Sequence, residues 1–292
     1  MSGISIKRIF RDVMNIKKDP LEDQGIYIHW NEEEIYKVKA LIIGPENTPY
    51  EYGNYLFDIT FPTEYPHKPP TVTFQTRHTN IRFNPNLYCC GKVCVSILNT
   101  WSGPQWTSCQ SLRSVLLSLQ TLLNENPIQN EPGFENENGE RSRLYNEILE
   151  YQNFNIAILK MINYPETFDI FIPQMRESFI NNYDKIMSRL KKHTNKNVNV
   201  FSPIYNISVN ANYKKLIPEI KELYLSFTVD LNVSSSLVVE PEKKINKCPT
   251  QKSKNYDVGY ILLSSNDNNK YVVYQDKNNV KKWKKYKENI IL

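Results

Sequence analysis

Apolar and polar positions in the first part of the chain change from helical to extended periodicity. Residues 4–18 carry apolar side chains three and four positions apart, the spacing of one helix face: Ile6, Ile9, Phe10, Val13 and Ile16. Four segments rich in β-branched and aromatic residues follow, with turn-forming residues between them: 26–30, 36–43, 55–61 and 71–74. Because the connections are short, we expect these four strands to form an antiparallel meander.

The pattern returns to helical spacing after residue 110. Six apolar residues predict one strongly apolar helix buried against the sheet: Leu112, Val115, Leu116, Leu119, Leu122 and Leu123. The Asn126-Pro127 pair should end this helix, and residues 141–163 are predicted to form another. Beyond residue 166 we expect a helix from Pro173, since proline suits the first helical turn, and a second helix from Pro218.

The end of the chain has a different pattern. Residues 229–255 combine serine, proline and many lysines, which is typical of a linker. Residues 256–275 alternate apolar and polar positions around a turn at 266–269, and residues 271–274 are predicted to be the return strand. The run 281–287 interleaves lysines with aromatic residues. For this run we favour a solvated helix end over a contact with nucleic acid or an acidic partner.

Composition narrows the class of protein. The 292 residues are 40% hydrophobic, which supports a folded core, and the net charge of +5 is too small to imply a nucleic-acid partner. We expect no membrane span, because no apolar run reaches about 18 residues, and no secretory signal, because the N-terminus lacks a long apolar segment. Five cysteines, two of them adjacent, make a poor disulfide framework. We therefore expect reduced thiols, in the cytoplasm or nucleus.

Candidate chemistry concentrates in residues 84–106, NPNLYCCGKVCVSILNTWSGPQW. Cys94 follows a Pro-Asn turn and a Gly-Lys turn, and its thiol can carry an acyl group as a thioester. The amide of Asn86 could donate a hydrogen bond to the oxygen that becomes negative when an amine attacks. No histidine or carboxylate lies within the motif. This disfavours a hydrolase, which needs a base to activate water, and favours an acyl carrier.

The cysteines of this stretch also raise the question of a metal site. Zinc needs four ligands, and no second Cys-x-x-Cys pair or histidine pair accompanies Cys89, Cys90 and Cys94. We therefore predict no metal. Cys89 and Cys90 are interpreted as loop thiols beside the site, which can form disulfides under oxidation.

Three motifs, in order, give the chain a family resemblance. They are the Pro-Asn and Gly-Lys-Val-Cys-Val-Ser-Ile-Leu segments around Cys94, the proline-rich run FPTEYPHKPPTVTF at 61–74, and the opening helix that ends in Lys-Asp-Pro. Together they resemble the ubiquitin-conjugating enzyme family over roughly residues 4–165. The resemblance implies an α+β fold with an N-terminal helix, a four-stranded antiparallel meander, an active-site loop and C-terminal helices.

The same resemblance predicts three regions along the chain. Residues 1–165 would form the conjugating catalytic domain, residues 166–228 a helical C-terminal extension, and residues 229–292 a linker with a small accessory tail of β-strands and basic residues. The extension, the segment ENPIQNEPGFE and the insertion at 102–106 are similar to a larger subclass. Members of that subclass work with the second, less common ubiquitin-activating enzyme. The accessory tail resembles no family.

Residue roles follow from the resemblance. Cys94 would be the nucleophile that takes ubiquitin as a thioester, and Asn86 would support the loop, stabilise the oxyanion, or do both. Asn84 stands where the family has a structural histidine, so we expect the loss of a buried hydrogen bond and unchanged chemistry. The family often has an acidic residue beyond the active site that orients or deprotonates the incoming lysine. Asn130 and Glu131 are the candidates here, and a solvated loop is the alternative.

Binding surfaces are implied in the same way. Lys7, Arg8 and Arg11 match the basic helix by which the family docks on the activating enzyme, whereas the residues alone would indicate a solvated face. The family's ligase contacts fall on His67, in the proline-rich turn, and on Pro104, in the altered loop after the motif. Because His67 replaces an apolar residue, we expect the usual RING and HECT ligases to be doubtful partners.

The predicted activity is ubiquitin conjugation: Cys94 accepts ubiquitin from the activating enzyme and passes it to a substrate lysine or a ligase cysteine. The implied partners are ubiquitin, the activating enzyme, a ubiquitin ligase and substrate proteins, with no cofactor, since the activating enzyme uses the ATP. Two alternatives stay open: the same chemistry with another ubiquitin-like modifier, and a non-catalytic ubiquitin-binding scaffold, against which Cys94 argues. The abundance of Asn, Lys, Ile and Tyr fits an AT-rich genome, as in a protist or in a large DNA virus whose protein would act in the host cell.

Overall fold

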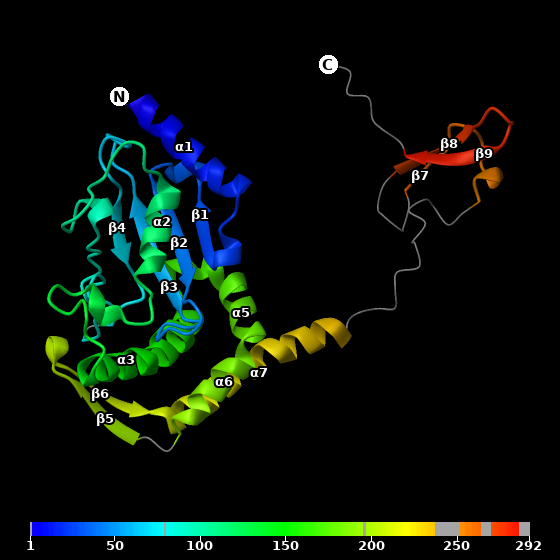
Figure 1. Ribbon diagram of the computed structural model, residues 1–292. Helices are drawn as coiled ribbons and strands as arrows, with labels where there is room; N and C mark the ends of the chain where they lie inside the picture. Colours follow the sequence, from blue (N-terminus) through cyan, green and yellow to red (C-terminus); the bar gives the residue numbers. More distant parts are fainter. Residues whose placement is uncertain (1, 79, 195–196, 237–251, 264–269, 286–292) are drawn as a thin grey trace. The chain divides into compact units, whose positions relative to one another are not determined.

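The computed structural model describes residues 2–78, 80–194, 197–236, 252–263 and 270–285 (Figure 1). The chain divides into two compact units, Met1–Val229 and Asp230–Leu292. Every predicted site residue lies in the first unit.

The first unit begins with helix α1 (Ser2–Lys18) and a four-stranded antiparallel sheet in the order β1-β2-β3-β4. The strands are β1 (Ile26–Trp30), β2 (Lys37–Ile43), β3 (Asn54–Thr60) and β4 (Thr71–Phe74), and the short turns η1 (Glu22–Gln24) and η2 (Glu32–Glu34) flank β1. In the register, Ala40 of β2 pairs with Ile28 and with Phe57, and Phe57 pairs with Phe74. The predicted meander is confirmed, and each strand boundary agrees with the sequence pattern to within one residue.

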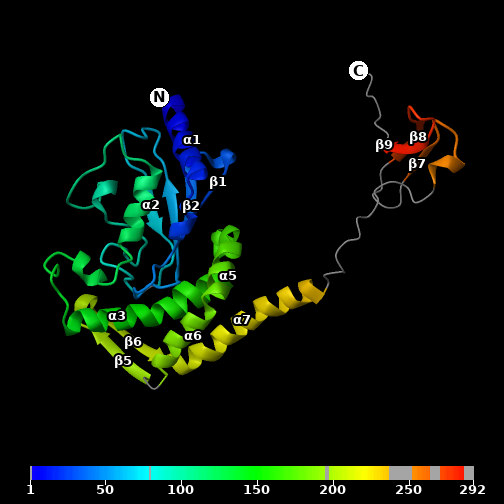
Figure 2. The same ribbon diagram turned by 45° about the vertical axis from the view of Figure 1, so that its right-hand side comes forward.

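Helix α2 (Leu112–Thr121) lies over the sheet in both views (Figures 1 and 2). Its apolar face is fully buried, as the spacing predicts: Leu112, Val115, Leu116 and Leu119 are 0% exposed. Ser111 caps the helix and accepts a hydrogen bond from the Ser114 backbone N–H, which satisfies one of the free donors of the first turn. This face of α2 therefore belongs to the hydrophobic core.

The predicted helix at 141–163 is present, but its middle is π-helical. Helix α3 (Glu140–Gln152) continues into the π-helical segment η5 (Asn153–Lys160) and then α4 (Met161–Asn163). The Asn153 side chain accepts a hydrogen bond from the Tyr55 hydroxyl (2.7 Å) and donates one to the Glu51 carbonyl (2.8 Å). Gly53 is required beneath this segment, since a Cβ there would lie 1.9 Å from Asn153 Oδ1. The π-helical segment, whose turns are wider than those of an α-helix, thus lies where the chain contacts the β2–β3 connection closely.

Residues 166–228 are only partly helical, which corrects the prediction of a helical extension. Their elements are η6 (Glu166–Phe171), α5 (Ile172–Asn181), α6 (Tyr183–Lys192), β5 (Asn197–Ser202), η7 (Ile204–Asn206), β6 (Ile207–Asn212) and α7 (Tyr213–Ser236). Strands β5 and β6 form an antiparallel hairpin, and residues of β6 alternate buried and exposed positions along ISVNAN. This alternation was a visible strand signal, but asparagine is a poor strand former and obscured it.

The start of the last helix also differs from the prediction. Pro173 lies in the first turn of α5, as expected. Helix α7, in contrast, begins at Tyr213 and contains Pro218 in its interior. The side chain of Asn212 accepts a hydrogen bond from the Lys215 N–H (3.1 Å), so an asparagine cap starts the helix five residues before the proline.

Several contacts join residues 166–228 to the preceding region. Arg189 of α6 forms ion pairs with Glu51 and with Glu150 of α3. Lys39 of β2 donates a hydrogen bond to the Thr167 hydroxyl (2.8 Å) and lies 4.2 Å from the centre of the Phe168 ring. One hydrophobic core runs through both regions. The functional division at residue 165 therefore stays a prediction within a single compact unit.

The second unit contains η8 (Ser253–Asn255) and an antiparallel sheet of β7 (Ile261–Leu263), β8 (Lys270–Gln275) and β9 (Lys281–Lys285). Strand β8 contains the predicted return strand, whereas the predicted turn at 266–269 lies outside the described residues. The described part of the basic run, residues 281–285, is a strand and not a helix end, because Trp283 pairs with Val273 and its ring centre lies 5.6 Å from that of Tyr256. Helix α7 extends through 229–236, where a linker was predicted, and 237–251 lie outside the described residues. None of the helices described is long and apolar enough to cross a membrane.

Candidate active site

Cys94 lies in a loop that two turns hold in place. The Cys94 N–H donates a hydrogen bond to the Asn86 carbonyl (2.9 Å), so the Pro-Asn turn and the cysteine lie side by side. Gly91 has a positive φ of 93°, which closes the turn between them without the strain that a side chain would add. After Cys94 the chain enters the short helix η3 (Ser96–Leu98). The cysteine is buried, with 2% of its surface exposed.

The Asn86 side chain supports this loop directly. Its amide nitrogen donates a hydrogen bond to the Cys94 carbonyl (2.5 Å), so the two residues are joined by main-chain and side-chain bonds. Its amide oxygen is buried and has no hydrogen-bond partner. An unpaired buried oxygen is costly to the folded state. The predicted loop-support role is therefore visible, and the oxyanion role stays a prediction.

Asn84 makes a complete set of buried hydrogen bonds. Its amide nitrogen donates to the Leu122 carbonyl (2.7 Å) and to the Tyr50 hydroxyl (3.1 Å), and its oxygen accepts from the Asn86 N–H (2.9 Å). Tyr50 in turn donates to the Phe83 carbonyl (2.6 Å), and burial raises the pKa of its phenol, which stays protonated. The Asn84 side chain is therefore fully hydrogen-bonded, and the loss of a bond relative to the family's histidine stays a prediction.

Asn130 belongs to the same network, at the end of the short helix η4 (Pro127–Asn130). Its amide nitrogen donates to the Asn84 oxygen (3.4 Å), and its oxygen accepts from the Asn124 amide (3.3 Å). The structure therefore brings Asn130 to Asn86 and Cys94 through Asn84. Glu131, the alternative candidate, accepts a hydrogen bond from the Tyr205 hydroxyl. Sequence reasoning did not identify Tyr205, which lies far away along the chain with no local motif.

The three basic residues of α1 have different environments. Lys7 and Arg11 are exposed. The Arg8 side chain is 10% exposed and forms an ion pair with the buried Asp12 (2.9 Å), and it donates a hydrogen bond to the Ser108 carbonyl (2.7 Å). Arg8 therefore ties α1 to the segment before α2, and the docking prediction rests on Lys7 and Arg11. The four-residue spacing of Arg8 and Asp12 could have indicated this pair from the sequence.

The two predicted ligase contacts lie on adjoining loops. His67 and Pro104 are both exposed. Between these loops Trp106 is buried and donates its indole N–H to the Pro66 carbonyl (2.7 Å). The Ser108 hydroxyl lies 3.4 Å from His67 Nδ1. The proline-rich turn and the altered loop thus form one continuous surface, and its ligase role stays a prediction.

The remaining thiols do not form a metal site in the part of the chain that is described, where no group of three His, Cys, Asp or Glu residues could hold an ion. Cys89, Cys90, Cys94 and Cys109 carry free thiols. Cys89 is partly buried, and this burial raises the pKa of its thiol, so it is a weaker nucleophile than an exposed cysteine.

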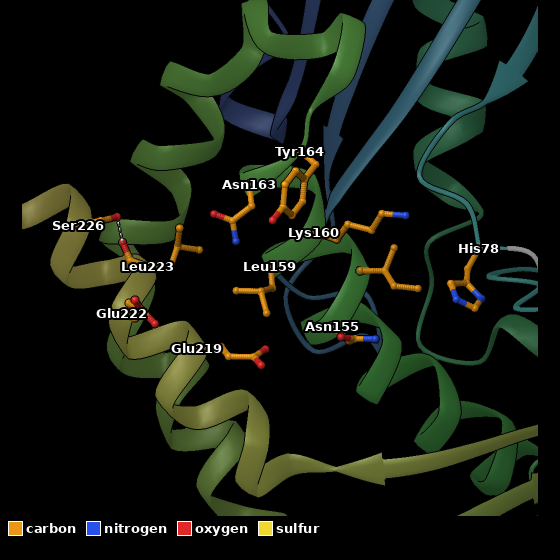
Figure 3. A pocket seen from close by; sticks show the side chains of 11 residues that line it. His78, Asn155, Leu159, Lys160, Asn163, Tyr164, Glu219, Glu222, Leu223 and Ser226 are labelled. Carbon is orange, nitrogen blue, oxygen red and sulfur yellow. Dashed lines mark hydrogen bonds between the residues drawn. The ribbon is translucent and has the colours of Figure 1, made fainter.

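A groove of about 700 Å³ lies apart from Cys94, between η5–α4 and α7 (Figure 3). Glu219 and Glu222 line it from α7, and Lys160 and His78 line it from the facing segments. Burial, and then the charge of Lys160, lower the pKa of His78, so its imidazole is neutral at physiological pH. Neither Cys94 nor Asn86 lines the groove.

Comparisons with known proteins relate the chain to one family. The family model described as ubiquitin-conjugating enzyme matches residues 8–155. The protein named ubiquitin-conjugating enzyme E2 Z of Xenopus tropicalis is 43% identical over 186 residues, which cover 63% of this chain and 59% of that protein. The Homo sapiens protein of that name is 46% identical over 158 residues, covering 53% of this chain and 44% of that protein.

Among solved structures, the E2 domain of a Toxoplasma gondii ubiquitin conjugating enzyme is 25% identical, with a TM-score of 0.41. The similarity covers 52% of this chain and 97% of that one. The chain spans about half the length of the curated relatives named above. The family match covers half of the chain and includes the Asn84–Cys94 loop, the sheet and helix α2. The chain belongs to the ubiquitin-conjugating enzyme family.

Proposed function

We propose that this chain is a ubiquitin-conjugating enzyme that carries ubiquitin as a thioester on Cys94. The observation that carries the proposal is the pairing of Cys94 with Asn86, in which two hydrogen bonds join the Cys94 backbone to a residue whose side-chain amide is a donor of the kind that stabilises an oxyanion. Family membership supplies the class of reaction. The relatives bearing E2 names extend beyond the aligned region, so the activity is proposed for this chain and not transferred to it.

The reaction proceeds in two balanced acyl transfers. The Cys94 thiolate attacks the ubiquitin thioester on the activating enzyme, a new carbon–sulfur bond forms, and the thiolate of the activating enzyme leaves. An amine of a substrate lysine, or a ligase thiolate, then attacks the Cys94 thioester, and the Cys94 thiolate leaves; with an amine, one proton is lost. Thiol exchange between similar thiols is nearly neutral in free energy, so the first step depends on access and orientation.

Access to Cys94 requires a local opening. Because only 2% of Cys94 is exposed, whereas Cys90 and Cys109 are exposed, the surrounding loop has to move before another protein's thioester can reach the sulfur. Limited alkylation followed by mass spectrometry tests this requirement. Cys90 and Cys109 should react first, and a Cys94 that reacted equally fast would remove the need for opening.

The proposed partners follow from the exposed parts of the predicted surfaces. Lys7 and Arg11 offer two cations to an acidic face of the activating enzyme. The loops that carry His67 and Pro104 are proposed as the ligase surface. The proposed compartment is the cytoplasm or the nucleus, where Cys94 stays reduced.

A loading assay tests the proposal. The chain is mixed with ATP, an activating enzyme and either ubiquitin or another ubiquitin-like modifier. Wild type and Cys109→Ala, an exposed-cysteine control, should form an adduct that reductant removes. Cys94→Ser should form a slower adduct that survives reductant, and Cys94→Ala should form none. Loading of Cys94→Ala at the wild-type rate would refute the assignment, and loading with another modifier alone would favour the alternative activity.

A further inference from the structure

Tyr205 occupies an unusual backbone conformation in the turn η7, between β5 and β6. Its φ of 62° lies in the left-handed region, which a bulky residue rarely adopts. Neighbouring residues hold the turn, since Ile204 and Ile207 are buried in the core. Backbone strain of this kind persists only where the surrounding structure determines it, and it concentrates at functional sites.

The Tyr205 ring packs against an arginine of the active-site region. The Arg82 guanidinium carbon lies 4.3 Å from the centre of the Tyr205 ring and 3.8 Å from the centre of the Tyr88 ring. The same guanidinium donates a hydrogen bond to the Pro85 carbonyl. Tyr145 of α3 also fixes the Arg82 backbone, because the Tyr145 hydroxyl donates a hydrogen bond to the Arg82 carbonyl (2.7 Å). The Tyr205 ring, in the extension, is therefore connected to the Pro-Asn turn through Arg82.

The Tyr205 hydroxyl reaches the same turn by a second route. It donates a hydrogen bond to the Glu131 carboxylate. The residue before Glu131 is Asn130, which donates to the Asn84 oxygen (3.4 Å), and that oxygen also accepts the Asn86 N–H (2.9 Å). Burial, and then the hydrogen bond to Glu131, raise the pKa of the Tyr205 phenol, which therefore remains a donor at physiological pH.

Two arms from one side chain therefore converge on the turn that carries Asn86. One runs from the Tyr205 ring through Arg82 to Pro85, and the other from the Tyr205 hydroxyl through the loop at 130–131 to Asn84. Asn86 bonds to Asn84 through its N–H and to Cys94 through its carbonyl and its side-chain amide, so we expect a shift of the turn to change the direction of that amide.

Resting on the proposed function, we propose that Tyr205 is a positioning residue for the discharge of the Cys94 thioester to an amine. The amine attack depends on the placement of the Asn86 amide, and a displacement of about 1 Å can reduce such a step by about a hundredfold. Loading is an exchange between thiolates and depends mainly on access to Cys94. Loss of Tyr205 should therefore slow discharge more than loading.

Three variants separate positioning from stability. Tyr205→Ala removes both arms and should slow discharge to free lysine by about tenfold or more, with loading changed less than about twofold. Tyr205→Phe keeps the ring on Arg82 and loses the bond to Glu131, and it should slow discharge by about threefold. The control is Tyr224→Ala, which removes an aromatic residue of the same extension that stacks on Tyr183 at 3.8 Å. It should leave the ratio of discharge to loading unchanged.

Double variants test the route. In an Asn86→Ala background, Tyr205→Ala should produce no further slowing of discharge, because the group that it positions is absent. Glu131→Gln combined with Tyr205→Phe should be no slower than the slower single variant. Equal slowing of loading and discharge in Tyr205→Ala, or a discharge-to-loading ratio that matches Tyr224→Ala, would overturn the positioning role. A wild-type chain that never loads would refute the proposed function, and that outcome is distinct from a loaded chain in which Tyr205→Ala discharges normally.

Discussion

Replacing Asn86 with alanine separates the two roles of its amide. In the folded protein the amide nitrogen donates to the Cys94 carbonyl at 2.5 Å, and the amide oxygen is buried without a partner. Asn86→Ala removes both groups at once. A purely structural asparagine should therefore show its effect in stability, and an oxyanion donor should show its effect in the rate of discharge.

The two effects on stability nearly cancel. Depriving the Cys94 carbonyl of this donor costs about 1–3 kcal/mol, whereas removal of the unpaired Asn86 oxygen relieves a penalty of similar size. We expect a net change in the unfolding free energy within about 1 kcal/mol, which corresponds to a melting-temperature shift of about 2–4 °C for a unit of this size. The loss of one oxyanion donor, in contrast, should slow the amine attack by about a hundredfold.

Single-turnover discharge measures the rate of amine attack separately from the change in stability. The protein is loaded, the activating enzyme is stopped, and loss of the Cys94 thioester to free lysine is followed, with the melting temperature measured in parallel. Asn86→Asp, which keeps the size and loses the donor, should discharge as slowly as Asn86→Ala. If loading and discharge fall together in proportion to a large loss of stability, Asn86 supports the loop alone and the oxyanion role is wrong.

Four further predictions address the rest of the chain. Replacing both Lys7 and Arg11 with glutamate should slow loading from the activating enzyme, most strongly at low salt, and should leave the discharge of preloaded protein unchanged. Equal loading rates for the variant and the wild type would show that these two residues of α1 are not part of the docking surface. Arg8→Ala should lower the unfolding free energy by about 3 kcal/mol in urea titrations, because it leaves the buried Asp12 carboxylate without its cationic partner, held only by the hydrogen bonds from Tyr65 and Leu112; a variant as stable as wild type would contradict the structural role. A chain that ends at residue 229 should fold and still load in a gel assay, because the first compact unit is complete there, and aggregation would place the tail in the catalytic fold. Burial raises the pKa of Tyr50 and of other phenols, so the unfolded chain ionises first and the urea midpoint should fall as the pH rises above about 10; a midpoint that rose above that pH would contradict this coupling.

The sheet and α2 were predictable because their signals are local. Each strand is a short segment rich in β-branched and aromatic residues between turn-forming residues, and α2 places its leucines on one face. The π-helical geometry of η5 was not predictable, since it accompanies contacts between Asn153 and the distant Gly53 turn. The β5–β6 hairpin was missed because its asparagine-rich strands are weak formers that are stabilised by packing against α3.

The candidate site likewise contains contacts that the sequence predicts and contacts that it does not. Cys94 and Asn86 lie eight residues apart in one motif, so their pairing could be inferred from the sequence. The bonds of Asn84 involve Tyr50 and Leu122, which no local pattern connects to it. The contact of Tyr205 with Arg82 and Glu131 depends on the path of the whole extension. A single sequence has no local feature that reports such long-range pairs.

The Tyr205 contact also has a consequence for protein synthesis. The ribosome adds Tyr205 roughly a hundred residues after Cys94, which at about 5–20 residues per second is on the order of ten seconds later. Until Tyr205 is added, Arg82 has Tyr88 but not Tyr205 against its guanidinium, and Glu131, once synthesised, lacks the Tyr205 hydroxyl. A messenger RNA truncated between these positions would encode the complete cysteine motif and yet yield a protein whose active-site loop lacks its anchor.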